Sequence, residues 1–365
     1  MKKMMTAFAV LLFVACGPKE VLPAEDWDPD VHATLTTMIR DAGKQAGKVR
    51  PYAVFDCDNT SIRHDVTHTL MLYAIENLRF AAAPAHDFLD GVDHPETVLE
   101  GCDGLTAAEM GRSLSARYAK LRALREAGIP MDTLRRTELY LDWRARMLAM
   151  YKGIGKSCSY GELCLWMPSL LEGMPKEEAL ALGRESLAYW FSFGKVWKEE
   201  WVSPDGRFRA VADKGLVLTP RMRHLYASLE KHGFDVYIVS ASPEWLVELF
   251  ACDPVYGLGL SEEQVYGIRM LPEDRVHALY DPDYPQPFKE GKVANIKRFL
   301  FPSHKDQAPA LVAGDSVGDL AMLTEWETMR TGLLMDIGRT DDFAGLVRQA
   351  RAGGNRGRFV AQTVN

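Results

Sequence analysis

The sequence predicts an α/β protein: a doubly wound, Rossmann-like parallel sheet with a large helical cap inserted after the first strand. Three runs of apolar and β-branched residues, at 52–55, 235–239 and 310–314, each end directly before polar side chains. Such runs are typical of parallel strands that are buried on both faces. Candidate helices alternate with these runs, and this alternation predicts a parallel sheet with right-handed crossovers.

The first run is the most informative, because Asp56, Asp58 and Thr60 follow it in an Asp-x-Asp-x-Thr pattern. Ligand sites of open α/β sheets lie at the carboxyl edge of the strands, and residues i and i+2 of a strand point to the same side. One carboxylate could therefore attack a substrate while the other transfers protons. The alternative is a capped strand–turn–helix with two solvated aspartates.

Three later segments carry complementary groups. At the end of the second run, the Ser240 hydroxyl and the Ala241 backbone N–H could donate to phosphoryl oxygens. Lys292 opens a candidate helix and could neutralise a phosphate as a point charge. Asp315 and Asp319 follow the third run, and their oxygens suit Mg²⁺, which pairs with phosphates. Each segment alone has an ordinary structural explanation, but all four in this order favour one site.

These four segments resemble the motifs of the haloacid dehalogenase superfamily, in particular its phosphoserine-phosphatase-like branch. The 23 residues from Lys292 to Asp315 fit that branch, and the resemblance covers about 200 of the 365 residues, in two blocks that flank a long insertion. Shorter strings at 55–60, 239–243 and 166–168 are similar to those of bacterial secreted phosphorylcholine phosphatases.

The resemblance implies that Asp56 is a nucleophile that forms an aspartyl-phosphate. Asp58 would protonate the leaving alcohol and then activate water. Mg²⁺ would be held by Asp56, the Asp58 carbonyl and Asp315, while Asp319 would orient Lys292 or a metal-bound water. Dehalogenase members need no metal and lack the second aspartate of the first motif, so this combination favours a phosphatase. The phosphate oxygens would be bound by Thr60, Ser240, Ala241 and Lys292.

The N-terminus predicts an exported lipoprotein. Two lysines precede an apolar stretch at 4–14 that is too short to span a bilayer. Small Ala15 before Cys16 resembles a bacterial lipoprotein processing site, with Cys16 as the lipidated residue. Lipoprotein processing sites usually have Leu three residues before the cysteine, where this chain has Phe13. An ordinary signal-peptidase site is therefore the alternative. We expect a periplasmic or cell-envelope protein that contacts the membrane only through this anchor.

The expected domains follow from these motifs. Residues 1–16 are the signal peptide and 17–25 a tether. The catalytic core comprises 26–61 and 210–365, and the cap comprises 62–209. In the core we expect a first helix at 27–42, a helix from Thr219 that ends before Gly233, a further strand at 332–337 and a frayed C-terminal stretch at 351–365. Helical periodicity predicts cap helices at 64–78, 107–127, 133–151 and 175–191.

Composition narrows the range of partners. The net charge of −7, without any basic run, gives no reason to expect nucleic acid. Export to an oxidising compartment makes disulfides plausible. We expect Cys57 to pack inward, one disulfide between Cys158 and Cys164, and a second between Cys102 and Cys252.

Specificity should reside in the cap, which holds five of the eight tryptophans. Helix-core packing is the simplest explanation for them; the functional alternative is an aromatic cage for a quaternary ammonium, helped by a carboxylate such as Glu162 or Glu172. Phosphorylcholine is the first substrate hypothesis, phosphoserine or a broad set of monoesters the second, and a non-catalytic surface lipoprotein the third. The five cap tryptophans are Trp143, Trp166, Trp190, Trp197 and Trp201.

Overall fold

The computed structural model describes residues 21–24, 26–44, 49–80, 88–271, 274–353 and 358–364. The predicted signal peptide, Cys16 and most of the tether therefore lie outside the described residues. Within these ranges, no helix combines the length and apolar character needed to cross a membrane.

The core is a six-stranded sheet in which every pair of neighbouring strands is parallel. Its order is β5-β4-β1-β6-β7-β8, so β1 lies in the middle with β4 on one side and β6 on the other. The chain order runs outward in opposite directions from β1, and such a switch point opens a crevice at the carboxyl edge. The strands are β1 Tyr52–Phe55, β4 Asp235–Pro243, β5 Val265–Ile268, β6 Leu311–Gly314, β7 Thr331–Asp336 and β8 Phe359–Thr363.

Helices cover both faces of the sheet, and the alternation of side chains along β1 shows why both faces are apolar. Ala53 and Phe55 belong to the larger apolar core together with α1 and α8. Tyr52 and Val54 belong to a second core with α10, α11 and α12. The core helices are α1 Pro29–Lys44, α8 Pro220–Lys231, α9 Glu244–Ala251, α10 Glu290–Phe299, α11 Leu320–Thr324 and α12 Asp342–Arg351.

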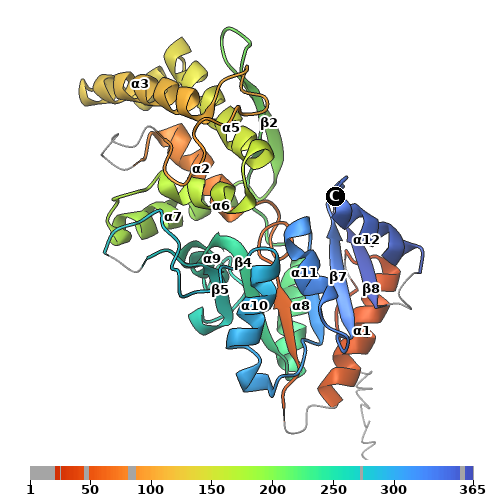
Figure 1. Ribbon diagram of the computed structural model, residues 1–365. Helices are drawn as coiled ribbons and strands as arrows, with labels where there is room; N and C mark the ends of the chain where they lie inside the picture. Colours follow the sequence, from red (N-terminus) through yellow and green to blue (C-terminus); the bar gives the residue numbers. More distant parts are fainter. Residues whose placement is uncertain are drawn as a thin grey trace, which may run out of the picture.

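Between β1 and α8 the chain forms a second layer of helices, which Figure 1 shows stacked on one end of the core. A two-stranded antiparallel hairpin, β2 with β3, completes it. We use the word cap for all of these elements. They are α2 Val66–Asn77, α3 Ala107–Glu126, α4 Met131–Leu134, α5 Glu138–Ser157, α6 Tyr160–Ser169, α7 Lys176–Phe191, β2 Trp197–Val202 and β3 Arg209–Lys214.

Several expected elements differ from the structure. The helix predicted at 133–151 begins at Glu138, because the Thr137 hydroxyl accepts the Tyr140 N–H and caps it there. A capping box formed by Ser159 and Glu162 starts α6, which the sequence analysis did not separate from its surroundings. The hairpin was also missed, although Trp197 to Val202 alternates exposed and less exposed side chains as an edge strand does.

The prediction of a frayed C-terminus is wrong. Residues 359–363 form β8, which pairs in parallel with β7 from Gly332 to Asp336. The strand is only five residues long and lies at the sheet edge, so its hydrophobic signal is weak. It is held by pairing with a distant segment, which local sequence does not reveal.

Neither predicted disulfide is present, because all five cysteines of the described ranges are free thiols. Cys158 follows the last residue of α5, whereas Cys164 lies inside α6 and lines an internal cavity. The Cys102 thiol instead donates a hydrogen bond to the Ala149 carbonyl at 3.4 Å. Cys57 is fully buried, as expected.

Candidate active site

The site forms where β1 ends between its two neighbours. The Asp56 N–H donates to the Ala313 carbonyl at 3.0 Å, which continues the pairing of β1 with β6 past the last strand residue. Asn59, three residues on, has φ of +56°, a left-handed conformation that asparagine tolerates better than most residues. The chain therefore turns sharply and keeps Asp56 at the carboxyl edge, where it is 7% exposed.

A buried lysine connects two of the aspartates. Lys292, in the first turn of α10, is 2% exposed and donates to Asp56 Oδ1 at 2.5 Å and to Asp319 Oδ1 at 2.7 Å. Burial alone would lower the pKa of Lys292, but the charges of Asp319 and Asp56 outweigh it and raise this pKa above its usual value. Lys292 is thus held as a cation beside Asp56.

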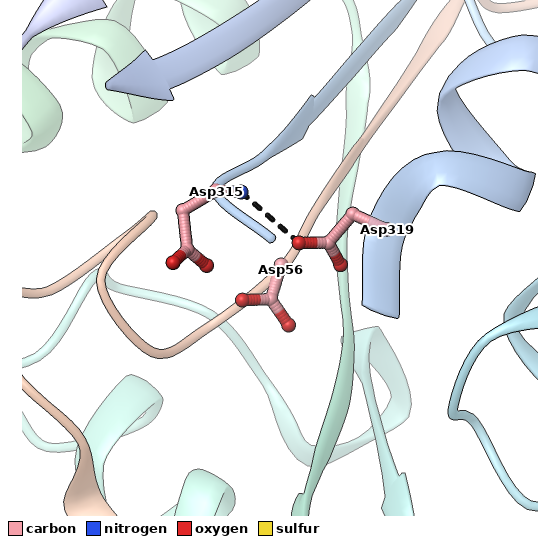
Figure 2. A group of neighbouring side chains, drawn as sticks. All are labelled: Asp56, Asp315 and Asp319. Carbon is pink, nitrogen blue, oxygen red and sulfur yellow. Dashed lines mark hydrogen bonds between the residues drawn. The ribbon is translucent and has the colours of Figure 1, made fainter. Parts of the chain in front are cut away.

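Asp56, Asp315 and Asp319 form a compact acidic cluster, with one carboxylate oxygen from each within 4.8 Å of the others. Figure 2 shows the three side chains together. The second oxygen of Asp319 accepts bonds from the Asp315 N–H at 3.0 Å and the Ser316 N–H at 3.1 Å. Both Asp319 oxygens thus accept hydrogen bonds, one from Lys292 and the other from the backbone N–H groups. Asp319 is therefore suited to positioning Lys292 and Asp315.

Asp315 has a partner that the sequence analysis did not identify. Arg339, in the loop after β7, donates from Nε to the Asp315 carbonyl at 2.7 Å and pairs with the Asp315 carboxylate through Nη2. Burial nevertheless raises the pKa of Asp315, and the charges of Asp319 and Asp56 act in the same direction. Three carboxyl groups thus meet two cations here, Lys292 and Arg339, and burial favours the neutral form of Asp315.

Asp58 is held at the junction of core and cap. Its Oδ2 accepts the Ser242 hydroxyl at 2.6 Å and its Oδ1 accepts the Val66 N–H at the start of α2 at 2.8 Å. Burial raises the pKa of Asp58 well above its usual value, and the charges of Asp65 and Asp56 add to this. A carboxyl group in this state can carry a proton at neutral pH and donate it.

A cavity of about 240 Å³ opens over these groups. Its floor includes the reactive carboxylates and Lys292 from the core, and its roof comes from the cap. A volume of this size suits a small molecule rather than a polymer segment. The cap residues that line it include Asp65, Thr67, Tyr151, Tyr160, Leu163, Cys164 and Met167.

The predicted site residues are placed unevenly around this cavity. Asp56, Asp58, Ala241, Lys292, Asp315 and Asp319 all line it, whereas Thr60 and Ser240 do not. The Thr60 hydroxyl donates to Asp315 Oδ1 at 3.4 Å. The Ser240 hydroxyl is fully buried and accepts the Ser242 N–H at 3.1 Å.

Ser242 takes the place at the cavity wall that was expected of Ser240. The pairing of β4 with β5 shifts register between Val239 and Pro243, and such an irregularity re-aims side chains at a strand end. Ser242 could have been noticed in the sequence, because it stands two residues after Ser240 in the same polar run. Arg339 and the tyrosines of the roof carry no comparable local signal.

The five cap tryptophans do not form a cage at this cavity, since none of them lines it. Trp143, Trp166, Trp190 and Trp201 are fully buried in the apolar core. The indole N–H of Trp190 donates to the Thr69 carbonyl, and Lys214 lies over the rings of both Trp190 and Trp201. The buried indole rings stabilise the cap, and the cation over Trp190 and Trp201 is a lysine of the protein itself.

Comparisons with known proteins agree with this geometry. The family model of haloacid dehalogenase-like hydrolases matches residues 172–324. A phosphorylcholine phosphatase of Pseudomonas aeruginosa is 25% identical over 339 residues, which cover 84% of this chain and 79% of that protein. A functionally unknown protein from Anaerococcus prevotii has a crystal structure with a TM-score of 0.83 at 26% identity, covering 95% of this chain and 97% of that one.

The matched family, the sheet and the motif residues define the class of protein. Residues 172–324 match the haloacid dehalogenase-like hydrolases, and the parallel sheet with its motif residues agrees with that class. The phosphatase relative and the paired aspartates at the end of β1 support a phosphatase.

The different placement of the two serines gives a direct test. Ser242→Ala removes a hydrogen bond to the Asp58 carboxyl, and we expect a loss of roughly tenfold in kcat/KM for p-nitrophenyl phosphate, since such bonds contribute about 1.5 kcal/mol. Ser240→Ala should change kcat/KM by less than about threefold, because its hydroxyl meets only a backbone N–H. A larger loss in Ser240→Ala than in Ser242→Ala would show that Ser240 serves the substrate after all.

Proposed function

We propose that the chain is a Mg²⁺-dependent phosphomonoesterase that acts through an aspartyl-phosphate on a small phosphorylated alcohol, with phosphorylcholine as the leading candidate. The observation that carries this proposal is the pairing of two different carboxyl groups at one sheet edge. Asp56 lies against the Lys292 ammonium, while Asp58 is held by Ser242 with a raised pKa. One group is set up as a nucleophile and the other as a proton donor.

The chemistry then runs in two displacements. An Asp56 oxygen attacks phosphorus, a new P–O bond forms, and the bond to the alcohol oxygen breaks as Asp58 supplies a proton to it. In the second step Asp58 takes a proton from water, and the water oxygen attacks the aspartyl-phosphate. Inorganic phosphate leaves and the Asp56 carboxylate is restored. Lys292, Ala241 and Ser242 line the cavity, and Lys292 and the Ala241 N–H would donate to the transferring group.

The acidic cluster fits a hard divalent cation. Asp56, Asp58, Asp65, Asp315 and Asp319 line the cavity against only two cationic side chains, which leaves negative charge that a metal would offset. The Asp56 and Asp315 carboxylates and the Asp58 main-chain carbonyl would hold Mg²⁺, as oxygen ligands do. When bound, it would screen the approach of a carboxylate to an anionic phosphate. Asp319 keeps the Lys292 ammonium next to Asp56 throughout.

The cavity roof supports a cationic alcohol as the leaving group. Tyr151 and Tyr160 supply aromatic rings, over which Lys152 and Lys289 lie at 5.4 and 5.6 Å. Asp65 supplies a carboxylate that is fixed by the His68 N–H at 2.8 Å. Aromatic faces and one acid are what a quaternary ammonium requires. The phosphorylcholine phosphatase relative points the same way. Phosphoserine and a broad range of monoesters are the alternatives, and a non-catalytic surface lipoprotein is the remote one.

We also infer export and a lipid anchor at Cys16, in the periplasm or cell envelope. The support is the N-terminal sequence alone: two lysines, a short apolar stretch, and Ala15 before Cys16. One acyl-modified cysteine would place the catalytic domain beside a membrane without any spanning helix.

Replacing the two aspartates separately tests the catalytic roles. Asp56→Asn should abolish phosphate release, because an amide does not attack phosphorus. Asp58→Asn should lower kcat by about 10²–10⁴-fold, the usual contribution of proton transfer, while Mg²⁺ affinity measured by calorimetry stays nearly unchanged. Folded Asp56→Asn protein that keeps more than a few per cent of wild-type turnover would contradict the assignment.

Metal removal tests the cofactor. Chelation with EDTA should abolish the activity of the wild-type enzyme, and added Mg²⁺ should restore it.

The substrate proposal is tested by comparing leaving groups. Tyr160→Leu and Asp65→Asn should each raise KM for phosphorylcholine by roughly tenfold, about 1.4 kcal/mol. KM for p-nitrophenyl phosphate, which lacks a cation, should change by less than about threefold. Trp143→Phe, a change inside the cap core, is the matched control and should leave the ratio of the two KM values as in wild type. Wild-type enzyme that hydrolyses phosphoserine or glycerol phosphate as well as phosphorylcholine would refute the choline preference.

The anchor is tested in the full-length chain. Cys16→Ser should prevent lipid attachment, so that the protein moves from the detergent phase to the aqueous phase or accumulates as an uncleaved precursor. Asp56→Asn is the control and should partition like wild type. Membrane retention that is unchanged in Cys16→Ser would leave simple secretion as the explanation.

A further inference from the structure

A second cavity of about 400 Å³ adjoins the catalytic one. The two cavities border each other, because they share four lining residues: Asn59, Asp65, Tyr151 and Arg339. None of the phosphatase motifs assigns a role to this second cavity. Because the second cavity shares lining residues with the catalytic cavity, a ligand bound in it would lie next to the catalytic site.

The charge of the second cavity is opposite to that of the first. Four cationic side chains line it, against two carboxylates. Asp213 is shared by two ammonium groups, at 3.4 Å from Lys152 and 3.9 Å from Lys198. Arg339, one of the shared lining residues, pairs with Asp315. In a chain with a net charge of −7, this is a local excess of positive charge.

Arg63 is the side chain that defines this excess. Its backbone is fixed, because the Arg63 N–H donates to the Val217 carbonyl at 2.9 Å. Over the described residues its guanidinium has neither a hydrogen-bond acceptor nor an ion pair. Partial burial lowers the pKa of Arg63, which records the cost of keeping that charge away from water. A guanidinium in this state gains free energy when an anion with several acceptor oxygens arrives.

We propose that the second cavity is an anion-binding vestibule, in which Arg63 holds the phosphate group of the substrate before it reaches Asp56 and inorganic phosphate as it leaves. This inference rests on the proposed phosphatase function. The catalytic cavity carries excess carboxylates, so a phosphate dianion gains from a cationic site at its border. Arg339 belongs to both cavities and connects the two, since its guanidinium lines the vestibule while it pairs with Asp315.

Binding of inorganic phosphate to the EDTA-treated protein tests the vestibule without turnover. Without metal there is no turnover, so the part of the binding seen by calorimetry that Arg63→Gln removes reports the cationic site. We expect Arg63→Gln to weaken this binding by about fivefold and Arg63→Lys to retain most of it. Lys120→Gln removes one exposed charge on α3 outside the vestibule, and it should match wild type. The difference between Arg63→Gln and wild type should shrink in 0.5 M salt.

Steady-state kinetics supplies the second arm. In Arg63→Gln, KM for p-nitrophenyl phosphate and the inhibition constant of inorganic phosphate should rise together by about fivefold, while kcat stays within twofold. Phosphate binding in EDTA that is absent from wild type, or equal in wild type and Arg63→Gln, would overturn the vestibule. A loss of kcat with unchanged phosphate inhibition would do so as well, because it would indicate a structural role. Neither result bears on the nucleophile, which the Asp56 variant tests separately.

Discussion

The Lys292 ammonium, buried between Asp56 and Asp319, is the interaction on which the rest of the site depends. Two carboxylates at this spacing repel each other, and the cation between them makes the arrangement tolerable. Removing one member of a buried ion pair typically costs about 3–5 kcal/mol, because the remaining charge stays unpaired in a low dielectric. Burial and the Asp319 charge raise the pKa of Asp56 to about 7, and the lysine opposes this rise by favouring the charged form. Lys292 also joins α10 to β1 and to the residues after β6.

A second constraint joins the cap to the core. The Asp58 carboxyl accepts the Ser242 hydroxyl from β4 and the Val66 N–H from α2. The Thr67 hydroxyl, one residue further along α2, donates in turn to Ser242 at 2.6 Å. This chain of hydrogen bonds fixes the first cap helix relative to the end of a core strand. Asp58, to which the proposed mechanism assigns proton transfer, thus also links the cavity roof to the core, and any movement of the roof changes its surroundings.

The sequence allowed the core of the site to be predicted because its signals are local. Each of the three catalytic strands is an apolar run that ends directly before its polar residues, and the order of strands and helices implies a parallel sheet. Arg339 could not be found in this way, since it meets Asp315 from 24 positions further along the chain. The roof tyrosines, likewise, become cavity residues only through the packing of α5 and α6 over the core. The number of tryptophans in the cap suggested an aromatic cage that the cavity does not have. Composition alone does not distinguish a ring packed in the core from a ring that lines a cavity.

The two ends of the described chain meet at β8. The Asp28 N–H donates to the Gln362 side chain at 2.8 Å, and the Asp28 carboxylate accepts the Thr363 N–H at 3.0 Å. The segment that leads into the first helix and the last strand are therefore fastened to each other over 334 and 335 positions of sequence. Release of β8 from the edge of the sheet would therefore also break its hydrogen bonds to the segment before α1.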